Sequence, residues 1–339
     1  MSFVWKLSNG HDVVVKLRLD DRVMQQATLE PPMAAPPRKS RRRWVLVAGL
    51  VVVVFGVAGF FVVRAASGPS VTSGQVAMPN LPWPSEGQAA AEVEGLGGIG
   101  TSGEQRPVPI ASLTKVMTAY VVLRDHPLTG DEEGPSIPVD QQAQDEAQSA
   151  RSTDESTVPV VAGQRLTERQ LLAAMLIPSG NNIARLLARW DAGSQLAFVP
   201  KMNAAAASLH MGQTFYTGAS GVEDSTVSTA ADQLLLARAA MANEVIASIV
   251  AVRSMRIPGV PGTIVNTNTL LGRDGVVGLK TGSTSAAGGA LMWAARTRGD
   301  RLIIGVVLYQ QQGGSAAAGL DAALSASQEL VRGIETSLR

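Results

Sequence analysis

The chain of 339 residues contains no cysteine and only three histidines, and both shortages restrict the chemistry that it can perform. Without cysteine it forms no disulfide, and it has neither a thiolate nucleophile nor a cysteine ligand for a metal. The histidines, His11, His126 and His210, do not form a metal-ligand spacing such as HExxH. We therefore expect neither a zinc enzyme nor a Ser-His-Asp triad, and no metal or other cofactor.

Lysine is also scarce, since six lysines stand against twenty-three arginines. Beyond residue 64 only Lys115, Lys201 and Lys280 remain. Arginine stays protonated in proteins, whereas a buried lysine can lose its proton, so these positions are candidates for proton transfer. The formal net charge is only +1, which gives no indication of a nucleic-acid partner.

A long apolar run near the N-terminus predicts a membrane helix. Residues 44–63, "WVLVAGLVVVVFGVAGFFVV", contain no charge and follow the basic cluster "RKSRRR" at residues 38–43. Twenty apolar residues suffice to cross a bilayer as a helix, whereas a core helix of a soluble protein would have a polar face. By the positive-inside rule, the basic cluster keeps the N-terminus in the cytoplasm and places the rest of the chain outside.

A cleaved signal peptide is the alternative, because "RAASG" after the apolar run is small enough to be cut. The apolar core would be longer than usual for such a peptide, so a signal anchor is favoured. We therefore divide the chain into a largely disordered cytoplasmic tail, a single membrane helix, a Gly/Ser/Pro linker and one globular domain, at residues 1–43, 44–63, 64–86 and 87–339.

The globular part has the pattern of an α+β fold. Apolar residues at spacings of three and four predict helices, and apolar β-branched runs predict strands. We expect one strand and a turn at 87–103, helices at 111–124, 166–177, 181–193, 229–250 and 318–338, and strands at 274–282, 289–300 and 301–311. Residues 125–165 read as a polar, irregular insertion. Strands at both ends with helices between them predict one sheet covered by helices, plus a helical lobe.

The first candidate motif is Ser112-Leu-Thr-Lys115, whose serine and lysine share one face of a helix. A serine hydroxyl is a poor nucleophile near pH 7 and needs an adjacent base. Lysine can be that base only if its pKa falls from about 10.4 to near 7. Burial and a second cation nearby could lower the pKa in this way. Alone, the pattern is common by chance.

The second motif is Pro178-Ser179-Gly180-Asn181, between two predicted helices. We expect Gly180 to supply a backbone bend, with Ser179 and Asn181 presenting a hydroxyl and an amide to a cleft. Taken alone, the pattern is more typical of a helix N-cap.

The third motif is Lys280-Thr281-Gly282, at the end of an apolar strand. It could be only a strand end with a glycine turn. It could also offer a cation and a hydroxyl to a carboxylate, while the glycine lets a substrate backbone lie against the strand. In the second case Lys280 would be the second cation that Lys115 needs.

The three motifs occur in the order S-x-x-K, S-x-N and K-T-G, a set typical of penicillin-binding proteins and β-lactamases. Over about residues 87–335 the chain resembles the low-molecular-mass penicillin-binding proteins that act as serine-type D-alanyl-D-alanine carboxypeptidases. The similar segments are "PIASLTKVMTAY", "LTERQLLAAMLIPSGNNIA", "FVPKMNAAAASLHMG", "NTNTLL" and "GLKTGSTSAAGGALMWAA". The resemblance implies the serine β-lactamase and transpeptidase fold, an antiparallel sheet flanked by helices with a helical subdomain.

The resemblance also implies a role for each motif residue. Ser112 would attack the carbonyl of the penultimate D-alanine, Lys115 would take its proton, and Ser179 would relay the proton to the leaving D-alanine. The backbone N–H groups of Ser112 and Ser283 would form the oxyanion hole. The remaining residues would bind the substrate peptide and its terminal carboxylate, namely Asn181, Lys280, Thr281 and Gly282.

From the resemblance we expect a peptidase of the bacterial cell membrane, with its catalytic domain outside the cytoplasm and its anchor in the N-terminal helix. Its partners would be the peptidoglycan stem pentapeptide and, as inhibitors that acylate Ser112, β-lactam antibiotics. Two features depart from the family. Asn182 stands where many relatives have Asp, which leaves the charge of the pocket open, and the anchor is N-terminal.

Three other functions share these motifs. A class A β-lactamase needs an E-x-x-L-N loop between the second and third motifs, and residues 182–279 contain none. An endopeptidase of the same family, which cuts cross-links between stem peptides, is harder to exclude. A membrane-tethered β-lactam sensor would acylate without turnover, but all the residues for turnover are present.

Overall fold

The computed structural model describes residues 2–6, 12–16, 78, 80–149 and 155–339 and divides the chain into two compact units, Met1–Val71 and Thr72–Arg339. In the first unit, β1 (Ser2–Lys6) and β2 (Asp12–Lys16) pair as an antiparallel hairpin. A largely disordered tail was expected at residues 1–43, and the ten described residues of that segment lie in these two strands, where valine favours an extended backbone.

The membrane helix expected at 44–63 lies outside the described residues. Within the described part of the chain, no helix by itself has the length and apolar composition of a membrane span. Two helices, α7 (Ala230–Met241) and α8 (Glu244–Val250), meet that criterion only when taken together, and they are bent by 101°.

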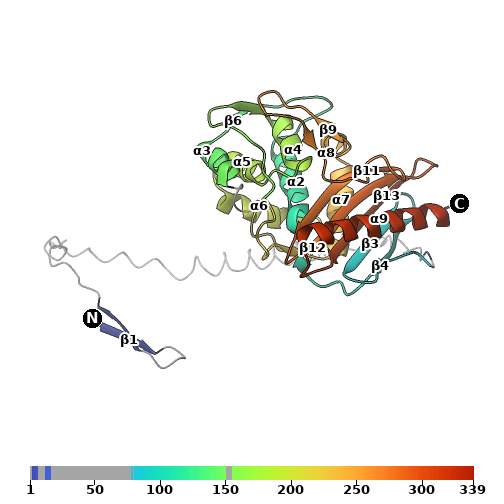
Figure 1. Cartoon of the computed structure of the whole chain (residues 1–339), viewed down its shortest axis with the longest axis horizontal. Coiled ribbons are helices and arrows are strands. Elements are labelled where there is room, and N and C mark those ends of the chain that lie inside the picture. Colours follow the sequence, from blue (N-terminus) through green and yellow to red (C-terminus); the bar gives the residue numbers. More distant parts are fainter. Residues whose placement is uncertain (1, 7–11, 17–77, 79, 150–154) are drawn as a thin grey trace, which may run out of the picture. The chain divides into compact units, whose positions relative to one another are not determined.

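A five-stranded antiparallel sheet forms the centre of the second unit (Figure 1). The three strands predicted at 274–311 are present, and the segment 87–103 forms a hairpin of two strands where one was expected. In sheet order the strands are β11 (Val276–Thr284), β12 (Gly288–Arg296), β13 (Leu302–Gln310), β3 (Gln88–Val93) and β4 (Gly97–Ser102). The first and last strands of the unit, β3 and β13, thus pair in one sheet, with β11 at its edge.

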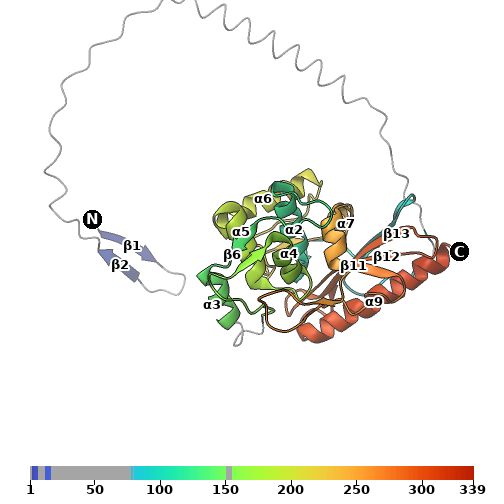
Figure 2. The same cartoon turned by 90° about the horizontal axis from the view of Figure 1, so that it is seen from above.

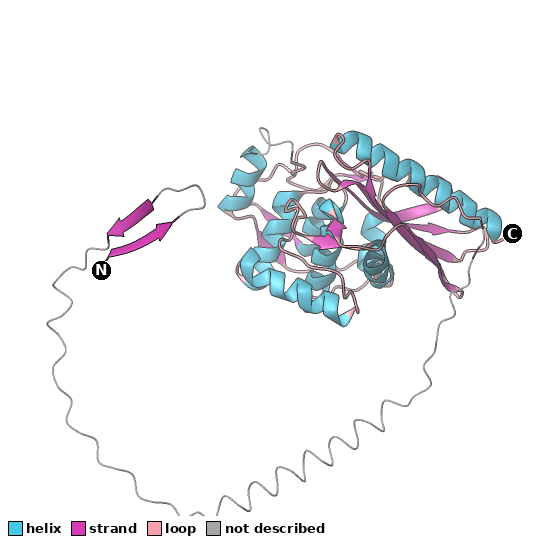
Figure 3. Cartoon of the chain, turned by 90° about the horizontal axis from the view of Figure 1, so that it is seen from below, coloured by secondary structure: helices cyan, strands magenta, loops and turns pink. Residues whose placement is uncertain are grey.

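Alternating side chains of the sheet divide the core into two layers. On β12, Met292 belongs to the larger cluster under the helical lobe, and its neighbour Trp293 belongs to the smaller cluster under the C-terminal helix α9 (Ala316–Ser337). Figures 2 and 3 show α9 along one face of the sheet and the other helices beyond the opposite face. Helix α9 approaches closely because Gly289 meets Gly319, where an added Cβ would lie 1.7 Å from a carbonyl oxygen.

The helical lobe contains four of the predicted helical segments and one helix, α6 (Gln195–Ser208), that was not predicted, and its helix α4 begins at the predicted cap. The Thr167 side chain accepts from the backbone N–H of Gln170, whose side chain accepts in return from the Thr167 N–H, so the capping box is confirmed. The helices of the lobe are α2 (Thr114–Asp125), α4 (Glu168–Leu176), α5 (Asn181–Ala192) and α6 (Gln195–Ser208), together with α7 and α8.

Two further segments differ from the sequence prediction. The segment 229–250 is two helices, because the Asn243 side chain accepts the first backbone N–H groups of α8 and so starts a new helix. The insertion at 125–165 is not wholly irregular: it contains α3 (Gln141–Ser149) and β6 (Ser136–Pro138), which pairs with β7 (Arg165–Thr167). The short strands β5 (Val108–Pro109), β8 (Val227–Ser228), β9 (Ser254–Met255) and β10 (Ile264–Val265) complete the described elements.

Candidate active site

The first motif forms a short turn that leads into α2. Ser112 lies in the 3₁₀ turn η2 (Ala111–Leu113), and Lys115 lies in the first turn of α2. The Nζ atom of Lys115 is 2.7 Å from the Oγ atom of Ser112, as the spacing of three predicts. Ser112 is half-buried and Lys115 is fully buried, so the hydroxyl is open to a reactant while the amine is not.

The lysine amine has two further oxygen partners. Nζ lies 2.6 Å from Oδ1 of Asn181 and 2.7 Å from the carbonyl oxygen of Ser220, and both atoms can only accept hydrogen bonds. A neutral amine has two N–H donors for these acceptors and a lone pair for the Ser112 hydroxyl. The arrangement therefore suits a neutral lysine that withdraws the serine proton.

Burial, above all, lowers the pKa of Lys115 well below its ordinary value. The charged groups around it act in both directions: Lys280 and Arg185 lower the pKa further, while Glu223 and Glu155 raise it. Lys280 thus acts on Lys115 as the second cation, as the sequence predicted.

The second motif bends at a different residue from the one predicted. Ser179, not Gly180, has the left-handed backbone, with φ of 66° against −61° for Gly180. Gly180 is required for close packing, because an added Cβ would lie 2.7 Å from the carbonyl oxygen of Ala174. A non-glycine residue at positive φ is a form of backbone strain found often at functional sites. Ser179 is buried beside Asn181, the first residue of α5.

The third motif lies within β11 and not at its end, since the strand continues to Thr284. Lys280 is buried, and burial lowers its pKa to about 7. Its Nζ is 3.5 Å from Oγ1 of Thr267, which is 2.5 Å from Oγ1 of Thr281. A cation and two hydroxyls therefore stand together at the edge strand of the sheet.

Gly282 brings this strand against the nucleophile. An added Cβ at Gly282 would lie 3.0 Å from the backbone nitrogen of Ser112 and 3.1 Å from the carbonyl oxygen of Ile110. The next residue, Ser283, is half-buried in β11. The absence of a side chain at Gly282 thus places the strand backbone directly beside that of Ser112.

Asn182 does not set the charge of the site. Its side chain is fully buried and bonds to the backbone N–H and carbonyl of Val158, at 3.0 and 2.9 Å, and to the carbonyl of Ala143. It therefore fastens the insertion to α5, and we infer that an amide is suited to this position because it must both donate and accept.

Sequence reasoning missed several residues around the site. Thr267 appeared only within the similar segment "NTNTLL", and the carbonyl of Ser220 carries no sequence signal because any residue has one. Glu155 and Arg185 lie in segments that resemble ordinary loop and helix surface. Their charges give Glu155 and Arg185 an effect on the pKa of Lys115, but this effect depends on a proximity that only the fold reveals.

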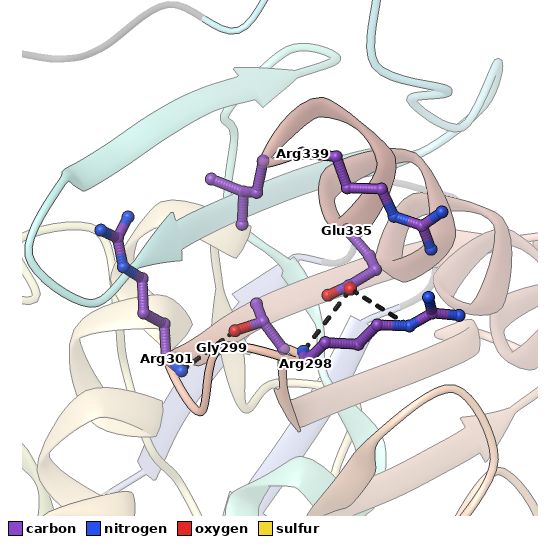
Figure 4. A pocket seen from close by; sticks show the side chains of 7 residues that line it. Arg298, Gly299, Arg301, Glu335 and Arg339 are labelled. Atoms are coloured by element: carbon purple, nitrogen blue, oxygen red, sulfur yellow. Dashed lines mark hydrogen bonds and ion pairs between the residues drawn. The ribbon is translucent and has the colours of Figure 1, made fainter.

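The cavity drawn in Figure 4 is a separate feature at the other end of the sheet. It measures about 440 Å³ and is lined by Arg298, Arg301, Arg339 and Glu335, among others. These residues surround the turn between β12 and β13, whereas Gly282 and Ser283 lie near the turn between β11 and β12. It contains none of the predicted site residues.

A serine hydroxyl in contact with a buried lysine amine, at the edge of an α+β sheet, is the arrangement expected of a serine acyl-transfer enzyme. The comparisons with known proteins are more specific. The family model for D-alanyl-D-alanine carboxypeptidases, a family of serine peptidases, matches residues 99–312. The chain belongs to this family.

Named relatives and solved structures agree with this assignment. A D-alanyl-D-alanine carboxypeptidase of Mycobacterium tuberculosis is 38% identical over 205 residues, which span 59% of this chain and 66% of that protein. A Streptomyces enzyme of the same name is 32% identical, over 58% of this chain and 71% of that protein. The crystal structure of penicillin-binding protein 6B from Escherichia coli has a TM-score of 0.64 at 30% identity, covering 76% of this chain and 80% of that one. The crystal structure of the Streptomyces K15 DD-transpeptidase also has a TM-score of 0.64, at 26% identity, covering 76% of this chain and 98% of that one. These two structures confirm the transpeptidase-like α+β fold.

Proposed function

We propose that this protein removes the terminal D-alanine from peptidoglycan stem peptides through an acyl-enzyme on Ser112. The observation that carries the proposal is the contact of the buried Lys115 amine with the Ser112 hydroxyl, in a site completed by Asn181. The family of the chain supports the choice of a peptide that ends in D-alanyl-D-alanine.

In the proposed reaction, Lys115 Nζ accepts the proton of the Ser112 hydroxyl as Oγ attacks the carbonyl carbon of the penultimate D-alanine. The C–N bond to the terminal D-alanine breaks, and the leaving amine takes up a proton, with Ser179 as the relay. Water then attacks the ester, and the Ser112 oxygen recovers its proton. The backbone N–H groups of Ser112 and Ser283 would stabilise the oxyanion, a contribution of about 3–4 kcal/mol per donor.

The edge of the sheet would hold the substrate. One side of β11 has no partner strand in the five-stranded sheet, so an extended peptide can lie along it. Lys280 and Thr281, with Thr267 behind them, would bind the terminal carboxylate, and a lysine with a pKa of about 7 gains its proton when that anion arrives. Asn181 would hold the peptide amide.

The test uses the full chain and a peptide that ends in D-Ala-D-Ala. We expect D-alanine release by the wild type and none by Ser112→Ala. A labelled penicillin should acylate the wild type and leave Ser112→Ala unlabelled. Labelling without D-alanine release would contradict the carboxypeptidase and leave an endopeptidase or a sensor.

An endopeptidase is the second candidate, because relatives named D-alanyl-D-alanine endopeptidases also match the chain. The one from Escherichia coli is 33% identical over 190 residues. Cutting of a cross-linked peptide dimer in preference to a pentapeptide would favour this function.

We also propose that residues 44–63 anchor the protein in the bacterial cell membrane with the catalytic unit outside, on the strength of the uncharged run and its basic flank. Protease added to intact cells should remove the penicillin-labelled unit and spare an epitope at the N-terminus. Protection of both ends would contradict this orientation.

A further inference from the structure

A carboxylate supplied by the insertion contacts the catalytic asparagine. Oε2 of Glu155 accepts from Nδ2 of Asn181 at 3.1 Å and from Nη2 of Arg185 at 3.2 Å. The side chains of Glu155 and Arg185 are only 25% and 15% exposed, so solvent screens the pair weakly.

The backbone holds Glu155 in this place. The N–H of Asn181 donates to the carbonyl of Ser156 at 2.8 Å, and Asn182 binds both backbone groups of Val158. Residues 155–158 are therefore fixed along the start of α5, which places Glu155 beside Asn181, and Arg185 holds its carboxylate there.

Glu155 settles which way the Asn181 amide faces. A carboxylate can only accept, so the Nδ2 of Asn181 must face Glu155, and its Oδ1 must then face Lys115. A reversed amide would place N–H groups against the lysine amine and an oxygen against the carboxylate.

We propose that Glu155, held by Arg185, is a positioning residue of the peptidase site, which orients Asn181 and balances the charge around Lys115. The proposal rests on the proposed function. Glu155 touches neither Ser112 nor the reacting bond and acts through Asn181 and through its field at Lys115.

The two members of the pair act on Lys115 with opposite sign. Glu155 raises the pKa of Lys115 and Arg185 lowers it. Of the other charged groups nearby, Lys280 lowers this pKa and Glu223 raises it. Removing one charge should therefore move the pKa in one direction, and removing the other should move it in the opposite direction. A charge pair too distant to act on Lys115 would change its pKa in neither variant.

Helix α5 offers a matched control one turn away. Arg189 makes comparable contacts with the insertion, at 2.7 and 2.9 Å from the carboxylate of Asp140 and at 3.2 Å from Oε1 of Glu146, whose carboxylate also lies 3.9 Å from Arg185. Arg189→Gln therefore removes ion pairs of the same type between the same two segments and leaves the Glu155–Asn181 and Glu155–Arg185 contacts in place.

The first experiment compares Glu155→Gln with Glu155→Ala in the full chain. Gln retains an acceptor for Asn181, whereas Ala leaves the amide free to turn. We expect Glu155→Ala to lower kcat/KM for D-alanine release roughly tenfold or more, mainly through kcat, as for the loss of a hydrogen bond to a charged group. Glu155→Gln should retain most of the activity at its own optimum pH, and Arg189→Gln should match the wild type.

The second experiment measures the acid limb of the kcat/KM profile, where activity appears as Lys115 loses its proton. Glu155→Gln removes a negative charge, lowers the pKa of Lys115 and should shift the limb to lower pH. Arg185→Gln removes a positive charge and should shift the limb to higher pH. Shifts in one common direction, or the same shift in Arg189→Gln, would overturn the proposal.

A readout without substrate separates this inference from the proposed function. The chain has only six lysines, so the ¹³Cε signal of Lys115 can be assigned by its loss in Lys115→Ala and titrated directly. Opposite pKa shifts in Glu155→Gln and Arg185→Gln would support the charge balance even if no D-alanine were released. An unchanged Lys115 titration in both variants would refute it even in an active peptidase.

Discussion

At the scale of single residues, Lys115 can serve as a base only because a lysine side chain can become neutral. Lys115→Arg keeps a long cationic side chain but cannot lose its proton. We expect acylation by a labelled penicillin and D-alanine release to fall by roughly 10³-fold, within the range for loss of a general base. The matched control is Lys201→Arg, because Lys201 is partly exposed and paired with Asp125 and Asp191. Substantial acylation by Lys115→Arg would show that another group takes the serine proton.

The sequence predicted the residues with intrinsic chemistry but not those that act through position. Ser112 and Lys115 could be recognised because three residues along a helix bring two side chains together. Glu155 and Asn181 meet only through the fold, since the segment that carries Glu155 is fastened to α5 by backbone contacts. The residue that carries the left-handed bend, Ser179, was likewise misassigned to Gly180, because composition favours glycine at such a turn and takes no account of packing against Ala174.

At the scale of elements, the contact between β11 and η2 depends on Gly282. In Gly282→Ala the new Cβ would lie 3.0 Å from the Ser112 nitrogen, so the strand or the turn must shift by a few tenths of an ångström or more. We expect kcat/KM to fall about 100-fold, the order expected for misplaced reacting groups, with a much smaller effect on the melting temperature. Gly299→Ala is the control, because a Cβ there meets nothing nearer than 3.8 Å. If both variants were equally active, the spacing at Gly282 would be irrelevant to catalysis.

Helices and strands were predicted correctly where their buried side chains recur at the period of a helix or a strand. The strands of 274–311 and the helix that ends the chain have strong periodicity, and they were found where expected. Helix α3 was missed because eight of its nine residues are at least partly exposed, so its sequence is polar and has little apolar period. The break before α8 depends on one capping side chain, Asn243, in an otherwise continuous apolar pattern.

At the scale of the whole molecule, two buried groups should give the stability opposite dependences on pH. Burial and the nearby Asp191 raise the pKa of Glu168 to about 7, so between about 4.5 and 7 the folded state holds a proton that the unfolded state has lost. Stability therefore falls as pH rises through that window. Lys280 is the reverse case, since its pKa is lowered to about 7, and between about 7 and 10.5 the unfolded state binds the extra proton. Stability rises there, by up to about 4–5 kcal/mol.

We expect these two groups together to give a minimum of the free energy of unfolding near pH 7. Urea denaturation at several pH values, followed by the fluorescence of the buried Trp293, would measure it. Glu168→Gln should remove the loss below pH 7, and Lys280→Met should reduce the gain above it, to which Lys115, whose pKa is also lowered, contributes as well. Unchanged slopes in the variants would show that other groups dominate.

The strand order has a consequence for the folding of the chain during its synthesis. In the sheet, β3 lies between β4 and β13, and Val93 pairs with Ile303. The strand β3 thus receives its second partner only after the whole helical lobe and strands β11 and β12 have been made. Pairings between such distant segments form slowly, and until then β3 exposes a bare backbone edge that can capture another strand. Within this unit the β3–β4 hairpin is made first and waits longest for its partner, so it is where we expect molecular chaperones to bind the unfinished chain.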